Sequence, residues 1–428
     1  MRCIWSACVA IGLLLASVTC YGQEGDARGL DASANSDTDV RTLTGFGGHI
    51  RADYFSASKT FDNHHSLPGL TLQPELSPKF ADWGAAKVVA RISDQDLRRD
   101  PPDWQGRLVE GYQDIYLKNV DLRIGKQIIA WGRADGLNPT DLVTPKDFTL
   151  LSAKAEDERR IGSPALKANV ALASSVLSFA WVPVFNPSTV PIPFPGLHFA
   201  EHKRDDGDWT HQGFAMKVDT VTSSVDWSAS YYYGLDVLPL IVPVTQTNFV
   251  LEHRRIHAFG VDFARSVGRF GVRGEAVFVH TQAGDVNLSP YLFYIIGADR
   301  NFTDDLNLNV QVFQRILTDF VDPSSVSDPL LRQATFANAI LRQQQDRVQE
   351  GMTARLRQTW LNRTWEAEVF GIWNANRNDF YIRPRIGYSF TDRLVGYMGA
   401  DIFNGPPISF FGSFRTLSGV FVELRAYL

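Results

Sequence analysis

The stretch "VDWSASYYY" at Val225–Tyr233 alternates apolar or aromatic residues with short polar ones. In an extended strand the two sets would lie on opposite faces, whereas helical spacing fits this order poorly. The same period of two recurs in "LNLNVQV" (306–312), "TWEAEVFGIW" (364–373) and "GVFVELRAYL" (419–428). The sequence therefore predicts many strands, each with one apolar and one polar face.

Short and long connections alternate between these predicted strands. The short polar turns lie at 118–119, 173–174, 220–224, 267–269, 298–303, 361–363 and 391–392. The longer segments are 94–106, 132–162, 183–210, 234–252, 318–349 and a brief one at 404–409. Outer-membrane β-barrels have short periplasmic turns and longer extracellular loops. Within 318–349, "LLRQATFANAILRQQQDRV" suggests a short helix, either a plug or a partner site.

The number of strands depends on the segment "LPGLTLQPEL" at 67–76. It is the weakest candidate, because Pro74 cannot donate a hydrogen bond to a sheet. With it, the chain forms an all-β, transmembrane antiparallel β-barrel of about eighteen strands, with sixteen as the alternative. The last stretch, which ends at Leu428, resembles the closing strand of bacterial outer-membrane proteins, although the usual terminal aromatic residue is replaced.

The N-terminus and the composition agree with export. Arg2 precedes an apolar run at 10–18, which predicts a signal peptide at 1–22, a flexible segment at 23–43 and a barrel at 44–428. All three cysteines lie in the predicted signal, so disulfides would not stabilise the mature chain. With 44% hydrophobic and 21% charged residues and no later long apolar run, we do not expect a spanning helix, which leaves a barrel as the membrane option. A soluble β-sandwich is the weaker alternative.

Two enzyme classes, a zinc protease and a serine hydrolase, are alternatives to this interpretation. His198–His202 reads H-x-x-E-H, a zinc protease pattern that requires a helix, but prolines and charges flank it. We therefore expect a loop here, as for His64 and His65. No G-x-S-x-G motif or phosphate loop occurs, and no basic stripe indicates nucleic acid. We predict no catalytic residue, no cofactor and no metal ligand, with a hydrolase using loop histidines as the alternative of another class.

Charged residues recur on the strand faces opposite the apolar ones. We expect them to face the lumen: Arg51, Asp53, Arg91, Glu110, Asp114, Asp121, Arg123, Arg273, Glu275, Arg355, Arg357, Glu366, Glu368, Arg383, Arg385, Glu423 and Arg425. Most should pair across strands. An unpaired remainder would set the field that a solute meets, and a net positive stripe near Arg355 would favour anions.

The run "DLRIGKQIIAWGRADGLNPTDLVTPKDF" resembles porin-like outer-membrane barrels of Gram-negative bacteria that share R-x-G-K-Q-x-x-x-W-G followed by G-x-N-P. The matching residues are Arg123, Gly125, Lys126, Gln127, Trp131, Gly132, Gly136, Asn138 and Pro139. Alginate-export and substrate-specific porins are more distantly similar. The resemblance implies a channel or transporter in the outer membrane, with no catalytic residues to carry over.

We expect "IIAW" to end a strand, with Trp131 at the membrane interface and the following residues in water. The segment 132–162 would then narrow the channel or form a surface lid. The candidate lumen or constriction residues in and beside it are Arg123, Gln127, Trp131, Arg133, Asp135, Asn138, Asp141, Lys146, Asp147 and 156–160. The expected partners are outer-membrane lipid, the barrel-assembly machinery, an unidentified solute and, as an open option, a periplasmic protein. Export of polysaccharide or hydrophobic molecules is the alternative transport function.

Overall fold

The computed structural model describes residues 45–57, 66–94, 104–148, 156–190, 198–201, 211–281 and 289–428. All of them belong to one compact unit, residues 40–428. The predicted signal peptide at 1–22, the segment 23–43, His64, His65 and His202 lie outside the described residues. Among the described residues, no helix is both long and apolar enough to cross a membrane.

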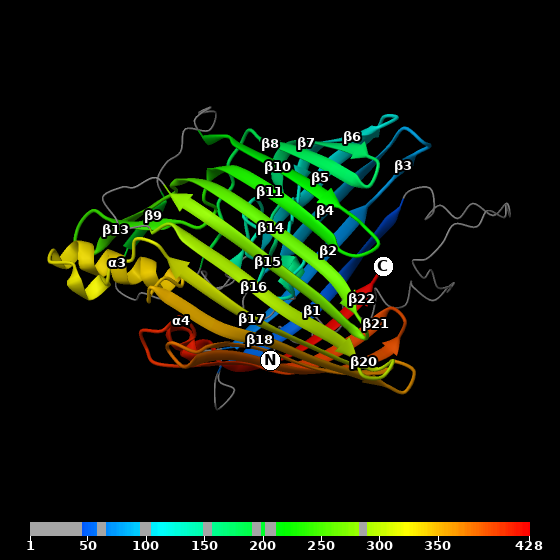
Figure 1. Cartoon of the computed structure of the whole chain (residues 1–428). Helices are drawn as coiled ribbons and strands as arrows, with labels where there is room; N and C mark the ends of the chain where they lie inside the picture. The colour runs from blue at the N-terminus through cyan, green and yellow to red at the C-terminus, as the bar shows by residue number, and fades with distance from the viewer. Residues whose placement is uncertain are drawn as a thin grey trace. The chain divides into compact units, whose positions relative to one another are not determined.

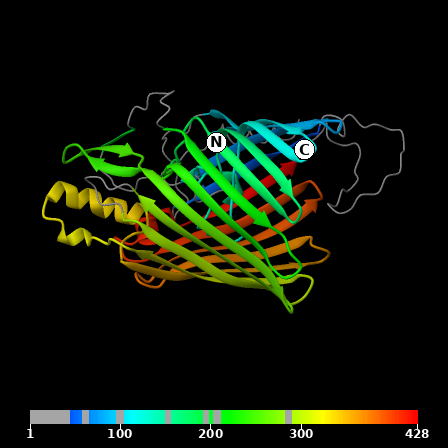
Figure 2. The same cartoon turned by 45° about the horizontal axis from the view of Figure 1, so that its top comes forward.

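Eighteen antiparallel strands of the described chain close into a barrel (Figures 1 and 2). They are β1 (Phe46–Ser56), β2 (Ser66–Leu76), β4 (Gly84–Ser93), β5 (Gln105–Tyr116), β6 (Val120–Gln127), β7 (Ser163–Leu172), β8 (Ser175–Val182), β10 (Gly213–Thr220), β11 (Asp226–Leu235), β14 (Arg255–Val267), β15 (Phe270–Thr281), β16 (Tyr291–Asn301), β17 (Leu306–Leu317), β18 (Val348–Trp360), β19 (Trp365–Asn374), β20 (Asp379–Thr391), β21 (Leu394–Asn404) and β22 (Gly419–Tyr427). The predicted fold and strand number are confirmed, and the sixteen-strand alternative is wrong.

The last strand closes the barrel against the first. β22 pairs with β1 from His49↔Tyr427 to Ser56↔Val420. The doubtful strand β2 is also present, and Pro74 lies opposite Gly48 of β1. On its other side β2 pairs with β4 at residues 71–72 and 75–76 but not between them. Proline has no backbone N–H to donate, and the ladder between β2 and β4 is interrupted at Pro74.

Side chains follow the predicted alternation, with the usual polarity reversed. Large apolar side chains on the outside are exposed, such as Phe259 at 54% and Val422 at 53%. Polar and charged side chains on the inside are buried, such as Arg51 at 0% and Glu275 at 3%. An apolar exterior around a polar interior is the arrangement of a barrel in lipid.

Each predicted tight turn joins neighbouring strands, although Ala298–Asn301 belong to β16 and the turn there is 302–305. The described parts of the long connections lie at the other barrel end (Figure 1). There β12 (Leu240–Pro243) and β13 (Asn248–Glu252) form a hairpin, and β9 (His198–Glu201) adds to it in parallel. Helix α3 (Pro329–Leu341) confirms the predicted helix and lies beyond the barrel strands (Figure 1). It packs on the hairpin, where Asn338 exchanges two hydrogen bonds with the backbone of Ile241. The remaining short elements are β3 (Lys79–Phe80), η2 (Glu156–Arg159), η4 (Pro323–Ser325), α4 (Phe410–Ser413) and η5 (Arg415–Leu417).

Candidate functional site

The segment between β6 and β7 folds into the barrel, and its described parts, 128–148 and 156–162, are here called the strap. β6 ends at Gln127, so the prediction that "IIAW" continues the strand is wrong. Ile128 instead donates its backbone N–H to the carboxylate of Glu110 at 3.1 Å, and Ile129 donates to the hydroxyl of Thr144 at 3.0 Å. The chain leaves the sheet four residues earlier than its apolar pattern suggests.

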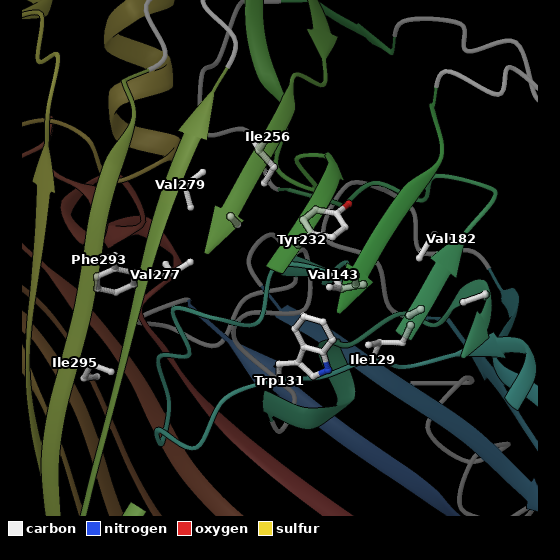
Figure 3. Close-up of a cluster of buried hydrophobic side chains, with 14 of the residues drawn as sticks. Ile129, Trp131, Val143, Val182, Tyr232, Ile256, Val277, Val279, Phe293 and Ile295 are labelled. Atoms are coloured by element: carbon white, nitrogen blue, oxygen red, sulfur yellow. The ribbon is translucent and has the colours of Figure 1, made fainter. Parts of the chain in front are cut away.

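Trp131 lies inside the barrel and not at the membrane interface, which corrects a second expectation. It is 7% exposed and, with Ile129 and Val143, packs against apolar wall residues from β7 round to β17 (Figure 3). The wall there includes Ala165, Ala180, Ala215 and Ala258, one on each of four strands. Small side chains on the wall leave room for the strap to enter. The indole is therefore an internal anchor that holds the strap by burial of apolar surface.

Glu275 of β15 holds the next residues of the strap. Its carboxylate accepts hydrogen bonds from the backbone N–H groups of Arg133 and Ala134, and from the Thr140 hydroxyl at 3.1 Å. Gly132 makes this approach possible: its φ is +106°, and a Cβ there would lie 2.6 Å from the Glu275 Oε1 atom. Gly136 has φ +83°, and a Cβ there would lie 2.9 Å from the Phe370 ring. Both glycines of the motif are thus required by close contacts.

Arg133 and Asp135 join the strap to the charged wall. The Arg133 guanidinium donates to Asp262 of β14 and Asp219 of β10, each at 2.6 Å. Asp135 pairs with Arg355 of β18 at 3.0 Å. Opposite charges at such distances, partly shielded from water, hold the strap in register with the wall.

An open cavity of about 520 Å³ lies beside Asp135. Its lining is Asp135, Asn301, Asn307, Arg355, Arg357, Glu366, Glu368, Arg385 and Tyr397. Three arginines face three carboxylates, so the described lining carries no net charge. The ion pairs alternate: Arg357–Glu366 at 2.6 Å, Arg385–Glu366 at 3.1 Å, Arg385–Glu368 at 3.2 Å and Arg355–Glu368 at 3.4 Å. The sequence did not decide whether a net positive stripe lies near Arg355; in this cavity the positive and negative charges are equal in number.

Several other predicted residues lie outside this cavity and pair with the barrel wall or within the strap. Arg123 pairs with Asp114 through two hydrogen bonds at 2.7 and 2.9 Å, and Gln127 donates to the Ala165 carbonyl at 3.0 Å. The Asn138 carbonyl accepts the N–H of Asp141 at 3.2 Å, closing a turn. The carboxylate of Asp141 is paired within the strap, with Lys146 at 3.0 Å and Arg160 at 3.3 Å. Arg383 faces Asp401 at 3.6 Å.

The far end of the strap meets the opposite wall through Glu158. Its carboxylate pairs with Arg51 of β1 and, at 2.9 Å, with Arg425 of β22, while its carbonyl accepts from Arg91 of β4 at 2.8 Å. Burial opposes ionisation of Glu158, but Arg51, Arg425 and Arg91 outweigh it and lower the pKa of Glu158 from 4.5 to about 2. The sequence marked 156–160 only as a charged run, because nothing local indicates that three distant arginines meet it.

The zinc-protease pattern does not have the required structure. His198–Glu201 is the strand β9, paired in parallel with β13 from Asn248↔His198 to Leu251↔Glu201. The zinc-protease pattern requires a helix, and the described part of the motif is a strand; His202 lies outside the described residues. No group of three or more metal-ligating side chains was found in the part of the chain that the structure describes.

Residues 21–318 match a family described as "Protein of unknown function (DUF1302)". The chain belongs to the DUF1302 family. No curated protein matches the sequence. Among solved structures, this DUF1302 chain is similar to the outer membrane protein OpdK of Pseudomonas aeruginosa, at 9% identity and a TM-score of 0.54, over 90% of this chain and 98% of that chain.

A BenF-like porin of Pseudomonas fluorescens is similar at 7% identity and a TM-score of 0.53, over 90% of this chain and 97% of that chain. OccK9 (OpdG) of Pseudomonas aeruginosa is similar at 8% identity and 0.53, over 90% and 97%. At such identities the likeness establishes the fold. It confirms the closed barrel fold that the sequence predicted, whereas the R-x-G-K-Q-x-x-x-W-G motif as the mark of a family stays a prediction.

Proposed function

We propose that this chain is an outer-membrane channel for small polar solutes, narrowed by the strap between β6 and β7. The observation that carries the proposal is the set of contacts that the strap makes across the interior. Arg133 reaches β10 and β14, Asp135 reaches β18, and Glu158 reaches β1 and β22. A surface lid would not require side chains on so many inner walls, so these contacts favour a constriction.

The distribution of apolar and charged residues supports an off-centre path. On the β7 to β17 side, Ile129, Trp131 and Val143 fill the space against an apolar wall. On the other side, the open cavity is lined by charged and amide groups and one tyrosine, from strands β16 to β21 and from Asp135 of the strap. A hydrated solute loses fewer hydrogen bonds along the second side. Since the charges there balance, we expect only weak selection between anions and cations.

The apolar exterior supports placement in the outer membrane, with lipid around the barrel. We expect β22 to serve as the strand that the barrel-assembly machinery recognises. Export of polysaccharide or hydrophobic molecules is the competing transport function. It would require a path wider or more apolar than the cavity beside Asp135.

Planar-bilayer recordings and liposome swelling with the purified full chain test the proposal. Discrete conductance steps and swelling with small neutral sugars are expected, and deletion of 132–162 should enlarge both. As a control, the exposed hairpin tip at 244–247, between β12 and β13, is replaced by Asn-Gly, a two-residue turn that suits a hairpin. Equal conductance of the wild type and the strap deletion would refute the constriction. Absence of conductance and swelling would refute the channel.

A further inference from the structure

The two ends of the strap are held by different kinds of contact. At the first end, Ile129, Trp131 and Val143 are buried in an apolar cluster. At the second end, the helical turn η2 reads Glu156-Asp157-Glu158-Arg159 and carries no apolar side chain. The carboxylate of Glu158 is held there by ion pairs with Arg51 and Arg425. Apolar packing cannot be replaced by a polar solute, but a carboxylate can be replaced by another carboxylate.

The wall around Glu158 is built to bind one more negative charge than it carries itself. It contains three arginines, Arg51, Arg91 and Arg425, but only two carboxylates. Asp53 accepts from Arg51 at 3.1 Å and Glu423 pairs with Arg425 at 2.8 Å, whereas Arg91 donates to the Gln73 amide oxygen at 2.9 Å and to the Glu158 carbonyl. Glu158 supplies the third carboxylate. Without it, three guanidinium groups would share two carboxylates, with Arg51 completely buried. A buried, uncompensated charge is strongly unfavourable, so the site requires an anion.

We propose that Arg51, Arg91 and Arg425 form a carboxylate-binding site which Glu158 occupies as an internal ligand, and that a carboxylate-bearing solute displaces it and releases this end of the strap. The inference rests on the proposed channel for its consequence, a wider path while the solute is bound. The binding site itself does not depend on transport.

Two backbone hydrogen bonds report directly on release of the second end. The N–H of Asp147 donates to the Arg159 carbonyl at 2.7 Å, and the N–H of Ile161 donates to the Pro145 carbonyl at 2.9 Å. The N–H of Ala134, bonded to Glu275, reports on the first end. Hydrogen exchange of these amides, followed by mass spectrometry on the purified full chain, therefore distinguishes the two ends without any conductance measurement.

The probe is sodium acetate, compared with sodium chloride at equal ionic strength and with acetamide, the neutral isostere. In acetate we expect exchange at Asp147 and Ile161 to rise about tenfold or more, as for loss of a charge-assisted hydrogen bond, with Ala134 unchanged. In the Glu158→Gln variant, the amides of Asp147 and Ile161 should exchange rapidly in either salt. Asp392→Asn, which removes an exposed turn carboxylate, should behave as the wild type.

The Arg425→Gln variant is checked for folding by heat-modifiable gel migration. Its exchange at Asp147 and Ile161 should be the same in acetate as in chloride. The inference is overturned if acetate leaves Asp147 and Ile161 as protected as chloride does, or if Glu158→Gln is as protected as the wild type. Bilayer recordings separate this from the proposed function. Exchange that responds to acetate in a chain without conductance would refute the channel and support the carboxylate-binding site. Conductance without an exchange response would support the channel and refute the carboxylate-binding site.

Discussion

Replacing Gly132 by alanine should detach the first part of the strap from the barrel wall. At φ +106° an alanine is strained, at about 1–2 kcal/mol or more. Its Cβ would also lie 2.6 and 2.7 Å from the two carboxylate oxygens of Glu275, so that side chain must move. The bonds it accepts from Arg133 and Ala134 would then be weakened, and each charge-assisted bond is worth about 1.5–3 kcal/mol. The local cost is therefore about 3 kcal/mol or more.

Hydrogen exchange at the Ala134 amide measures this cost, because 3 kcal/mol corresponds to about a hundredfold faster exchange. Gly47→Ala is the matched control: it lies in β1, and an added Cβ there meets no atom within 4 Å. We expect its exchange to stay within about threefold of the wild type. Unchanged protection of Ala134 in the Gly132→Ala variant would refute the argument that this glycine is required by the Glu275 contact.

Three further outcomes are expected. Trp131→Ala leaves a cavity in the apolar cluster and should destabilise the strap locally by about 3–5 kcal/mol, seen as faster exchange at Ile129, with the barrel intact by heat-modifiable migration. Arg355→Gln leaves two arginines against three carboxylates in the cavity, so reversal potentials should shift towards cation selectivity, with Asn307→Gln as the control. The pKa of Glu158 is lowered to about 2, so the stability that its ion pairs give the strap is present above pH 4.5 and lost as pH falls through about 2. Protection of the Ile161 amide should therefore be constant between pH 8 and pH 5, after correction for intrinsic exchange.

The strands could be predicted because each carries its own evidence. Alternation in "VDWSASYYY" fixes which residues face outwards, and the short polar turns fix the neighbours. The wall residues Arg355, Glu366, Glu368 and Arg385 could be placed inside the barrel and near one another by the same alternation. Their pairing into one charge-balanced cavity also followed the expectation that opposite charges on adjacent strands meet.

The position of "IIAW" could not be predicted in this way, because an apolar run is equally compatible with a strand and with any other buried segment. The sequence feature that indicates its position lies in the barrel strands against which it packs. In "AVFV" at Ala276–Val279 both faces are apolar, which is unexpected for a strand between lipid and water. Val277 and Val279 do face inwards, at 2% and 0% exposure. Apolar inward residues on several strands indicate that an apolar segment from elsewhere must cover them.

The same reasoning explains why the strap should open from one end. Ile129 and Trp131 meet a wall with alanines at the points of contact, so their fit depends on shape as well as on removal from water. Glu158 needs only charge and hydrogen-bond geometry, which any small carboxylate shares. Because a passing polar solute can compete for the second kind of contact and not for the first, a channel constricted by this strap should yield at Glu158 while Trp131 stays in place.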